Sequence, residues 1–138
     1  DLVIAVPCVW IDVDSLDDLD AAASAFRAAQ GFRLRIATKY HRLVREFLTE
    51  NGIADYQLVD SQGATEGTVK NLTAEAIADI TSSGETLRAN HLKILSDGLI
   101  HQSEATLYAA LGADWTAAQP ILAQIQERLG LKLLGGLE

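Results

Sequence analysis

Short apolar runs alternate with segments of helical periodicity, and this alternation constrains the fold more than any other feature of the chain. Apolar runs at residues 2–6 and 76–80 have the length of buried strands. Residues 34–37 alternate as in a strand with one exposed side, and residues 56–59 form a further short strand. Strands that alternate with helices form a mainly parallel sheet with helices on its faces. The sequence therefore predicts an α/β fold, with ligands expected at the carboxyl ends of the strands.

The ends of several helices carry clear signals. Ser15 and Asp18 form a capping box, and Gly31 is suited to end the helix that follows. Thr38 is expected to cap a second helix, and Pro120 suits the first turn of a final one. We expect helices at residues 16–30, 39–50 and 120–129, a weak short helix at 65–72, and further strand segments at 92–95, 99–100 and 105–110.

Length and charge limit the classes of function. The chain has 138 residues, of which 49% are hydrophobic, so one domain with a real core is expected. The net charge of −8 argues against nonspecific binding to nucleic acid or to anionic membranes, both of which need a basic face. No apolar run approaches the length of a membrane span and no signal peptide is visible, so we expect a cytoplasmic protein.

Cys8 is the single cysteine, so an intrachain disulfide and a zinc site built on paired cysteines are both excluded. It stands beside an apolar strand. We interpret it as a small buried or half-buried residue rather than as a nucleophile.

Two charged clusters each allow two interpretations. The acidic cluster is either a solvated helix start, which we favour because the helix dipole stabilises carboxylates there, or a loop for a divalent ion. The basic cluster is either a plain helix face or a patch that faces phosphate, in which Lys39 and Arg42 are the candidates. The acidic cluster comprises Asp12, Asp14, Asp17, Asp18 and Asp20, and the basic cluster comprises Lys39, His41, Arg42 and Arg45.

Residues 75–87 combine a strand, a hydroxyl-rich turn and a helix start. Free N–H groups at a helix start bind anions, and the hydroxyls of the turn can donate to phosphate oxygens. Gly84 lets the backbone approach a ligand closely or adopt a positive φ. An ordinary strand–turn–helix connection with Ser and Thr as caps is the alternative, since the stretch is neither a Walker loop nor a Rossmann fingerprint.

Carboxylates in this stretch suggest further chemistry. Asp79 can accept hydrogen bonds from sugar hydroxyls or help to hold a magnesium ion, which binds through one or two carboxylates. Glu75 is the second candidate ligand for magnesium. Phosphate, sugar and metal at one strand end together describe a phosphorylated ribose. No residue pair suited to nucleophilic or acid–base catalysis is found.

Four blocks occur in order along the chain, at residues 35–40, 63–66, 75–80 and 83–92. Together they resemble ATP phosphoribosyltransferase, the family that carries out the first step of histidine biosynthesis, and the last block is the most specific. The resemblance covers about residues 1–110. Where the family usually has Thr, Asp and a Gly-X-Ala lead-in, this chain has Ser83, Glu75 and residues 72–74. The first two changes keep the hydroxyl and the charge.

This resemblance implies a fold like that of type II periplasmic binding proteins. It implies a glycosyltransferase that joins N1 of ATP to C1 of 5-phosphoribosyl 1-diphosphate and releases pyrophosphate, with magnesium. Catalysis would come from positioning and charge neutralisation, so no nucleophile is required. The residues it implies for binding phosphoribosyl diphosphate are Asp79, Thr81, Ser82, Ser83, Gly84, Glu85 and Thr86.

The resemblance also implies a domain layout. Residues 1–11 would be a crossover strand from a first domain, residues 12–90 a second domain, and residues 91–134 a segment that returns to the first. Residues 135–138 are interpreted as a possible tag remnant. We expect a fragment that is inactive alone. It would come either from a truncated long form or from a short form, and the protein would be a homo-oligomer or would assemble with a histidyl-tRNA-synthetase-like regulatory subunit.

Two other functions remain open at the level of sequence. One is a noncatalytic solute-binding or sensor module of the same periplasmic-binding-like architecture. The other is an unrelated α/β domain whose hydroxyl loop is only a cap.

Overall fold

The computed structural model describes residues 1–61, 63–108, 110 and 112–130. The chain divides into two compact units, Asp1–Ser103 and Glu104–Glu138. The first unit contains the sheet and all of the residues predicted to bind a ligand.

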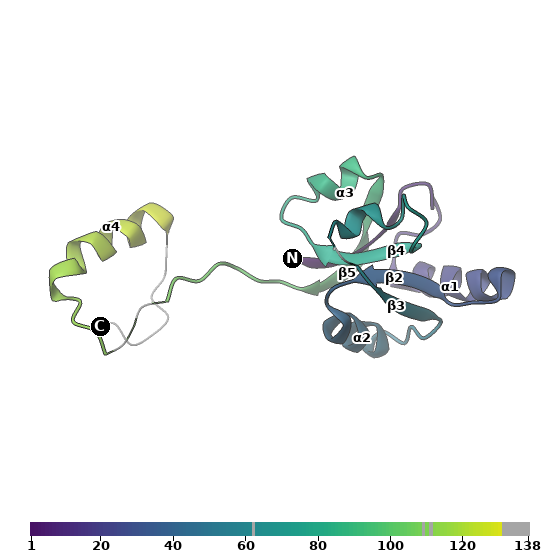
Figure 1. The fold of residues 1–138 in the computed structure, drawn as a ribbon, viewed down its shortest axis with the longest axis horizontal. Coiled ribbons are helices and arrows are strands. Elements are labelled where there is room, and N and C mark those ends of the chain that lie inside the picture. The colour runs from purple at the N-terminus through teal and green to yellow at the C-terminus, as the bar shows by residue number, and fades with distance from the viewer. Residues whose placement is uncertain (62, 109, 111, 131–138) are drawn as a thin grey trace. The chain divides into compact units, whose positions relative to one another are not determined.

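A five-stranded sheet in the order β3-β2-β4-β1-β5 forms the centre of the first unit (Figure 1). β2 runs parallel to both β3 and β4, whereas β1 runs antiparallel to both β4 and β5. Only β1 therefore points against the other strands, and the prediction of a mainly parallel α/β sheet is confirmed. The strands are β1 (Leu2–Pro7), β2 (Leu34–Thr38), β3 (Tyr56–Asp60), β4 (Ala76–Ile80) and β5 (Leu92–His101).

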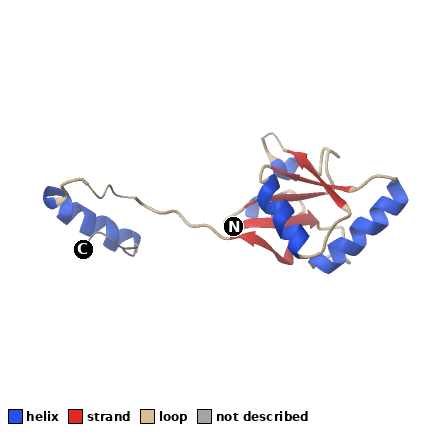
Figure 2. Cartoon of the chain, turned by 90° about the horizontal axis from the view of Figure 1, so that it is seen from below, coloured by secondary structure: helices blue, strands red, loops and turns tan. Residues whose placement is uncertain are grey.

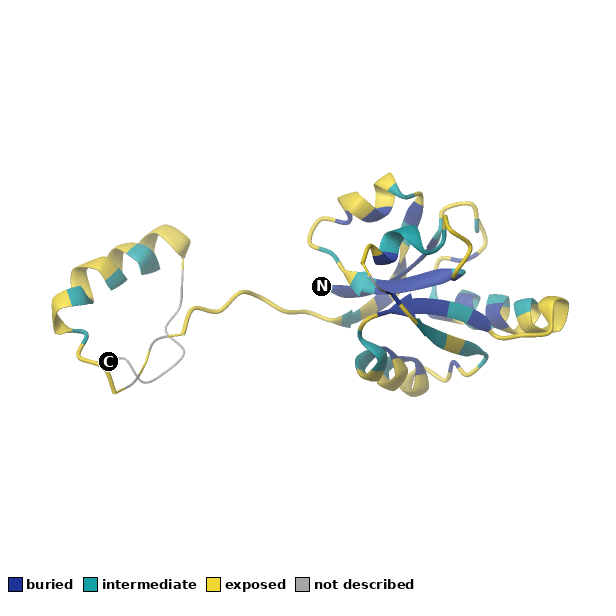
Figure 3. Ribbon diagram, viewed as in Figure 1, coloured by how far each residue is buried: buried dark blue, intermediate teal, exposed yellow. Residues whose placement is uncertain are grey.

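Helices cover both faces of this sheet (Figure 2). One face, with Ile4 and Ala78, packs against α1 (Leu16–Gln30) and α2 (His41–Glu50). Val3 and Ile77 point to the opposite face, which packs against Leu87 of α3 (Glu85–Ala89). The 3₁₀ turn η1 (Thr65–Gly67) also contacts β4. The central strands are accordingly buried, as Figure 3 shows.

The predicted start of α1 is confirmed and that of α2 is wrong in detail. The Ser15 side chain accepts a hydrogen bond from the Asp18 N–H, and Asp18 accepts in return from the Ser15 N–H, which completes the capping box. Thr38 is instead the last residue of β2 and is fully buried. Its hydroxyl accepts from the Tyr40 N–H, and α2 begins at His41 without a side-chain cap.

Three further element predictions need correction. The weak helix expected at residues 65–72 is reduced to η1. The segments expected at 92–95 and 99–100 are one strand, β5, which pairs with β1 through register shifts. Residues 105–108 and 110, expected to be a strand, have no regular structure. All five are exposed, and among the described residues no strand pairs with this apolar run to satisfy its backbone.

The structure does not test the predicted division of the chain between a first and a second domain. β1 and most of β5 pair in the same sheet as residues 12–90, so residues 1–103 form one compact unit. The assignment of residues 1–11 and 91–134 to a first domain stays a prediction. Residues 135–138, interpreted as a tag remnant, lie outside the described residues.

The second unit contains η2 (Thr116–Ala118) and α4 (Gln119–Leu129), and α4 confirms the predicted final helix. The carboxylate of Asp114 accepts from the hydroxyl and the backbone N–H of Thr116. These bonds hold the pKa of Asp114 below its ordinary value. Within the described residues, no helix is long and apolar enough to cross a membrane.

Cys8 and the acidic cluster also have clear positions. Cys8 is exposed, contrary to prediction, because β1 ends at Pro7 and the chain turns away from the core.

Hydrogen bonds from Asp14 N–H and the Ser15 side chain keep the pKa of Asp18 below its ordinary value. Asp14 pairs with Lys93 at 2.7 Å. In the part of the chain that the structure describes, no group of three or more His, Cys, Asp or Glu residues could hold a metal ion.

Candidate functional site

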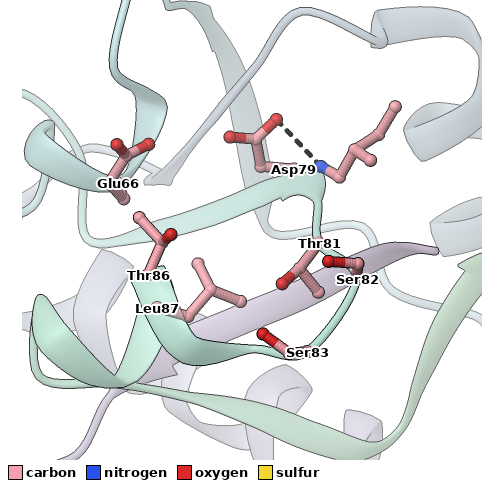
Figure 4. A pocket seen from close by; sticks show the side chains of 8 residues that line it. Glu66, Asp79, Thr81, Ser82, Ser83, Thr86 and Leu87 are labelled. Carbon is pink, nitrogen blue, oxygen red and sulfur yellow. Dashed lines mark hydrogen bonds between the residues drawn. The ribbon is translucent and has the colours of Figure 1, made fainter.

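A cavity of about 440 Å³ opens at the carboxyl end of β4 (Figure 4). β4 begins with three buried residues, and burial falls to half at Asp79 as the strand emerges from the sheet. The loop at residues 81–84 then leads directly into α3. The cavity is lined by Glu66, Asp79, Ile80, Thr81, Ser82, Ser83, Thr86 and Leu87.

Two hydroxyls and one arginine fix the shape of this loop. The Thr81 hydroxyl accepts from the Gly84 N–H at 2.9 Å, and the Ser83 hydroxyl accepts from the Glu85 N–H at 3.3 Å. Arg88 donates from Nη1 to the Ser83 carbonyl at 3.1 Å. Gly84 is buried with φ of 75°, a left-handed conformation that favours glycine. The predicted role of Gly84 in shaping the turn therefore has a structural basis.

Several donors of the loop remain open. The backbone N–H groups of Ser82, Ser83, Thr86 and Leu87 make no hydrogen bond to another residue among those described. The hydroxyls of Ser82 and Thr86 are likewise without a partner there. Because α3 is only five residues long, the attraction for an anion comes from these individual donors rather than from a long helix dipole.

Carboxylates line the same cavity. Asp79 uses Oδ1 to accept the N–H of its neighbour Ile80 at 2.9 Å, which leaves its other oxygen without a partner in the described part of the chain. Glu66 comes from η1 and was not predicted as a site residue. It belongs to the block at residues 63–66 that carries part of the family resemblance, but only the contact between η1 and β4 brings it to the cavity.

Glu75 lies at the other end of β4, about 13 Å from Asp79 at the usual rise of a strand. Both of its carboxylate oxygens accept from Arg35, and one also accepts from the Arg35 backbone N–H at 2.7 Å. The hydrogen bond to Glu75 raises the pKa of Arg35 above its ordinary value, and burial opposes this rise. Glu75 is thus engaged by Arg35 and is not among the residues that line the cavity, and its expected role as a magnesium ligand stays a prediction.

The remaining predicted residues do not line the cavity. Lys39 and Arg42 follow β2, whose carboxyl end faces the same way as that of β4. Arg42 is exposed and pairs with Glu46 at 3.7 Å, which fits a plain helix face. Glu85 is exposed, and only its N–H takes part in the loop.

Comparison with known proteins decides the family. The family model described as ATP phosphoribosyltransferase matches residues 1–130. The chain belongs to the ATP phosphoribosyltransferase family. A relative from Cereibacter sphaeroides with this name is 77% identical over 133 residues, which cover 96% of this chain and 56% of the relative.

A second ATP phosphoribosyltransferase, from a Bradyrhizobium species, is 51% identical over 132 residues, covering 92% of this chain and 41% of the relative. The chain thus spans about half the length, or less, of the relatives that it matches.

A solved structure shows the same fold. The ATP phosphoribosyl transferase (HisG:HisZ) complex from Thermotoga maritima matches with a TM-score of 0.51 and 23% identity. The match covers 72% of this chain and 40% of that chain. The ATP phosphoribosyltransferase fold inferred from the four sequence blocks is therefore also found by comparison of structures.

Proposed function

We propose that this chain forms the phosphoribosyl-binding part of an ATP phosphoribosyltransferase. This glycosyltransferase moves a phosphoribosyl group from 5-phosphoribosyl 1-diphosphate to N1 of ATP and releases pyrophosphate, the first step of histidine biosynthesis. Membership of the family supports the reaction. The observation that carries the assignment of the site is one cavity that combines unpartnered donors with carboxylates at the end of β4.

Hydrogen-bond donors and a carboxylate in this cavity would bind different parts of the substrate. The open N–H and O–H donors around Ser82, Ser83 and Thr86 suit the 5-phosphate, because each can donate to a phosphate oxygen. Asp79 suits the ribose hydroxyls, since a carboxylate accepts hydrogen bonds and repels a phosphate. This division would orient the sugar, with its phosphate on the loop and its hydroxyls toward Asp79.

The reaction depends more on the orientation of the substrates than on a nucleophile or base supplied by the protein. The bond from C1 to the diphosphate oxygen breaks, a bond from C1 to N1 of adenine forms, and the bonding electrons leave with pyrophosphate. N1 already carries the electron pair for the new bond. Holding the phosphoribosyl group in one orientation lowers the barrier by fixing the reacting atoms in place. This role matches the cavity, which has donors and carboxylates but no nucleophile with a base among the described residues.

Magnesium is part of this proposal. Asp79 has one carboxylate oxygen engaged by Ile80 and one open among the described residues, which fits an ion held by a single carboxylate together with waters and substrate oxygens. When bound, the ion would neutralise negative charge on the diphosphate. Glu75 does not fit this role, because Arg35 occupies its carboxylate.

The finer expectations on location and assembly are also proposals. We place the protein in the cytoplasm, where ATP and phosphoribosyl diphosphate are available. The matching Thermotoga maritima structure is a HisG:HisZ complex, which supports assembly with a regulatory subunit, and a homo-oligomer is the other arrangement. The match to a family of transferases favours this function over a noncatalytic solute-binding module.

Calorimetric titration of this chain with 5-phosphoribosyl 1-diphosphate and magnesium tests the proposal. We expect binding that weakens at least about tenfold in Asp79→Ala, the loss typical of a hydrogen bond to a charged group. Asp17→Ala, the same change at an exposed residue of α1, should leave binding unchanged. Equal losses in both variants, or no binding at millimolar ligand, would contradict the assignment. We further propose that the chain alone has no turnover with ATP, and measurable product would contradict that.

A further inference from the structure

The carboxylate of Glu66 lines the cavity from a different element than Asp79. Asp79 stands near the end of β4, whereas Glu66 belongs to η1, which contacts β4. Figure 4 shows Glu66 and Asp79 on one side of the cavity and Ser83 on another. The two carboxylates thus reach one cavity from segments that are 13 positions apart in sequence.

The position of Glu66 is fixed by its neighbour. Thr65 is 1% exposed, and its hydroxyl lies 2.6 Å from the hydroxyl of the buried Ser61. The Thr65 carbonyl accepts from the Thr68 hydroxyl at 2.7 Å, and the Thr68 carbonyl accepts from the Thr73 hydroxyl at 3.0 Å. This chain of hydrogen bonds holds η1 in place, so the Glu66 side chain starts from a rigid backbone.

Glu66 has no structural task that would explain a carboxylate at this position. It is half-buried and makes no ion pair or hydrogen bond with any other residue that the structure describes. Glu75, the comparable acid at the other end of β4, is fully engaged by Arg35. An unpartnered carboxylate beside a phosphate site would repel the phosphate unless it binds another part of the same ligand.

We propose that Glu66 accepts hydrogen bonds from sugar hydroxyls together with Asp79. The two carboxylates would then select a pentose phosphate with free hydroxyls over bare phosphate, which only the loop donors can bind. This inference rests on the proposed function and adds a specificity-determining residue to the same site. A charged acceptor strengthens a hydrogen bond from a hydroxyl, so its removal should be measurable.

Calorimetry with two probes tests this role in magnesium-free buffer. Ribose 5-phosphate and inorganic phosphate are titrated into the 138-residue chain, into Glu66→Gln and into Glu50→Gln. Glu50 is exposed at the end of α2 on the opposite face of the sheet, so it controls for the loss of one charge. We expect Glu66→Gln to bind ribose 5-phosphate about tenfold more weakly. Its affinity for inorganic phosphate should stay within about twofold or rise slightly, because a nearby negative charge is gone.

Each other outcome has a distinct meaning. Equal losses for both probes would make Glu66 a structural residue, and urea unfolding of the variant would then show the matching loss of stability. A loss seen only when magnesium is added would assign Glu66 to the metal instead. An unchanged affinity in Glu66→Gln, with binding intact in the parent chain, would overturn this inference alone. No binding of ribose 5-phosphate by the parent chain would overturn the proposed function and this inference together.

Discussion

The two ends of β4 carry acidic residues of the same kind with opposite roles. Before the strand, Glu75 is 14% exposed in its side chain and binds Arg35 through both carboxylate oxygens. Near the carboxyl end of the strand, Asp79 lines a cavity beside a loop with unpartnered donors. A carboxylate that is saturated by a protein partner holds the fold together, and one that is left open is available to a ligand.

Loss of the Glu75 charge should have the largest effect on stability. Glu75→Gln leaves the Arg35 guanidinium, 29% exposed, without its charged partner. We expect the free energy of unfolding to fall by about 2 kcal/mol, below the cost of breaking a fully buried ion pair because this pair is partly solvated. Urea unfolding measures this change. Asp79→Ala should change stability by no more than about 0.5 kcal/mol, as is usual at a solvated site.

The same variant also tests the assignment of roles. At a temperature where it is folded, Glu75→Gln should bind ribose 5-phosphate within about twofold of the parent, since it lies about 13 Å from Asp79. If Glu75→Gln bound ribose 5-phosphate weakly and kept its stability, Glu75 would be a ligand-binding residue. The two ends of β4 would then not differ in role.

The local parts of this contrast could be predicted from sequence. β4 was expected at residues 76–80 and occupies Ala76–Ile80, because a short apolar run ending in an acid and a hydroxyl-rich turn is a local pattern. The capping box of α1 was found for the same reason. The strand expected at residues 105–110 failed because a strand needs a neighbour, and no local pattern reveals whether one is present.

The parts of the site that were missed depend on contacts between distant residues. Arg35 is 40 positions from Glu75, so no local signal could show that Glu75 is engaged. Glu66 reaches the cavity only because η1 packs against β4. The hydroxyls and Gly84 of the loop are adjacent in sequence and share one turn, so their proximity follows from the sequence, whereas their role in binding stays a prediction.

A side chain at Gly84 should distort the loop that follows β4. Its φ is 75°, and a Cβ built there would lie 3.0 Å from Arg88 Nη1, the group that also binds the Ser83 carbonyl. Gly84→Ala should lower the free energy of unfolding by about 1.5 kcal/mol through left-handed strain. It should also weaken binding of ribose 5-phosphate at least about tenfold, because a shift of about 1 Å in a binding loop has effects of this order or larger. Calorimetry and urea unfolding measure the two effects.

Gly31 provides a matched control for this loop. It ends α1 with φ of 79° and ψ of 3°, close to the 75° and 4° of Gly84, and a Cβ there would meet nothing within 4 Å. Gly31→Ala should therefore cost about the same strain, near 1.5 kcal/mol, without loss of ligand affinity. If both variants keep full affinity, the shape of the loop at Gly84 does not matter for binding.

Substitution of Leu72, which precedes β4 on the side of Glu75, should have the smallest effect on stability, and it should raise stability rather than lower it. Leu72 stands where the family usually has the glycine of its lead-in, and it adopts φ of 59° although the residue is 80% exposed. The left-handed conformation costs a residue with a Cβ about 1–2 kcal/mol. Glycine would remove most of this cost but gain up to about 1 kcal/mol of conformational freedom in the unfolded chain.

We therefore expect Leu72→Gly to raise the free energy of unfolding by about 0.5 kcal/mol, with unchanged affinity for ribose 5-phosphate. Leu72→Ala is the matched control, because it removes the exposed side chain and keeps the Cβ that causes the strain. A gain in both variants would trace the effect to the leucine side chain rather than to the backbone. A loss in Leu72→Gly alone would mean that the turn before β4 relies on a stiff residue to present Glu75 to Arg35.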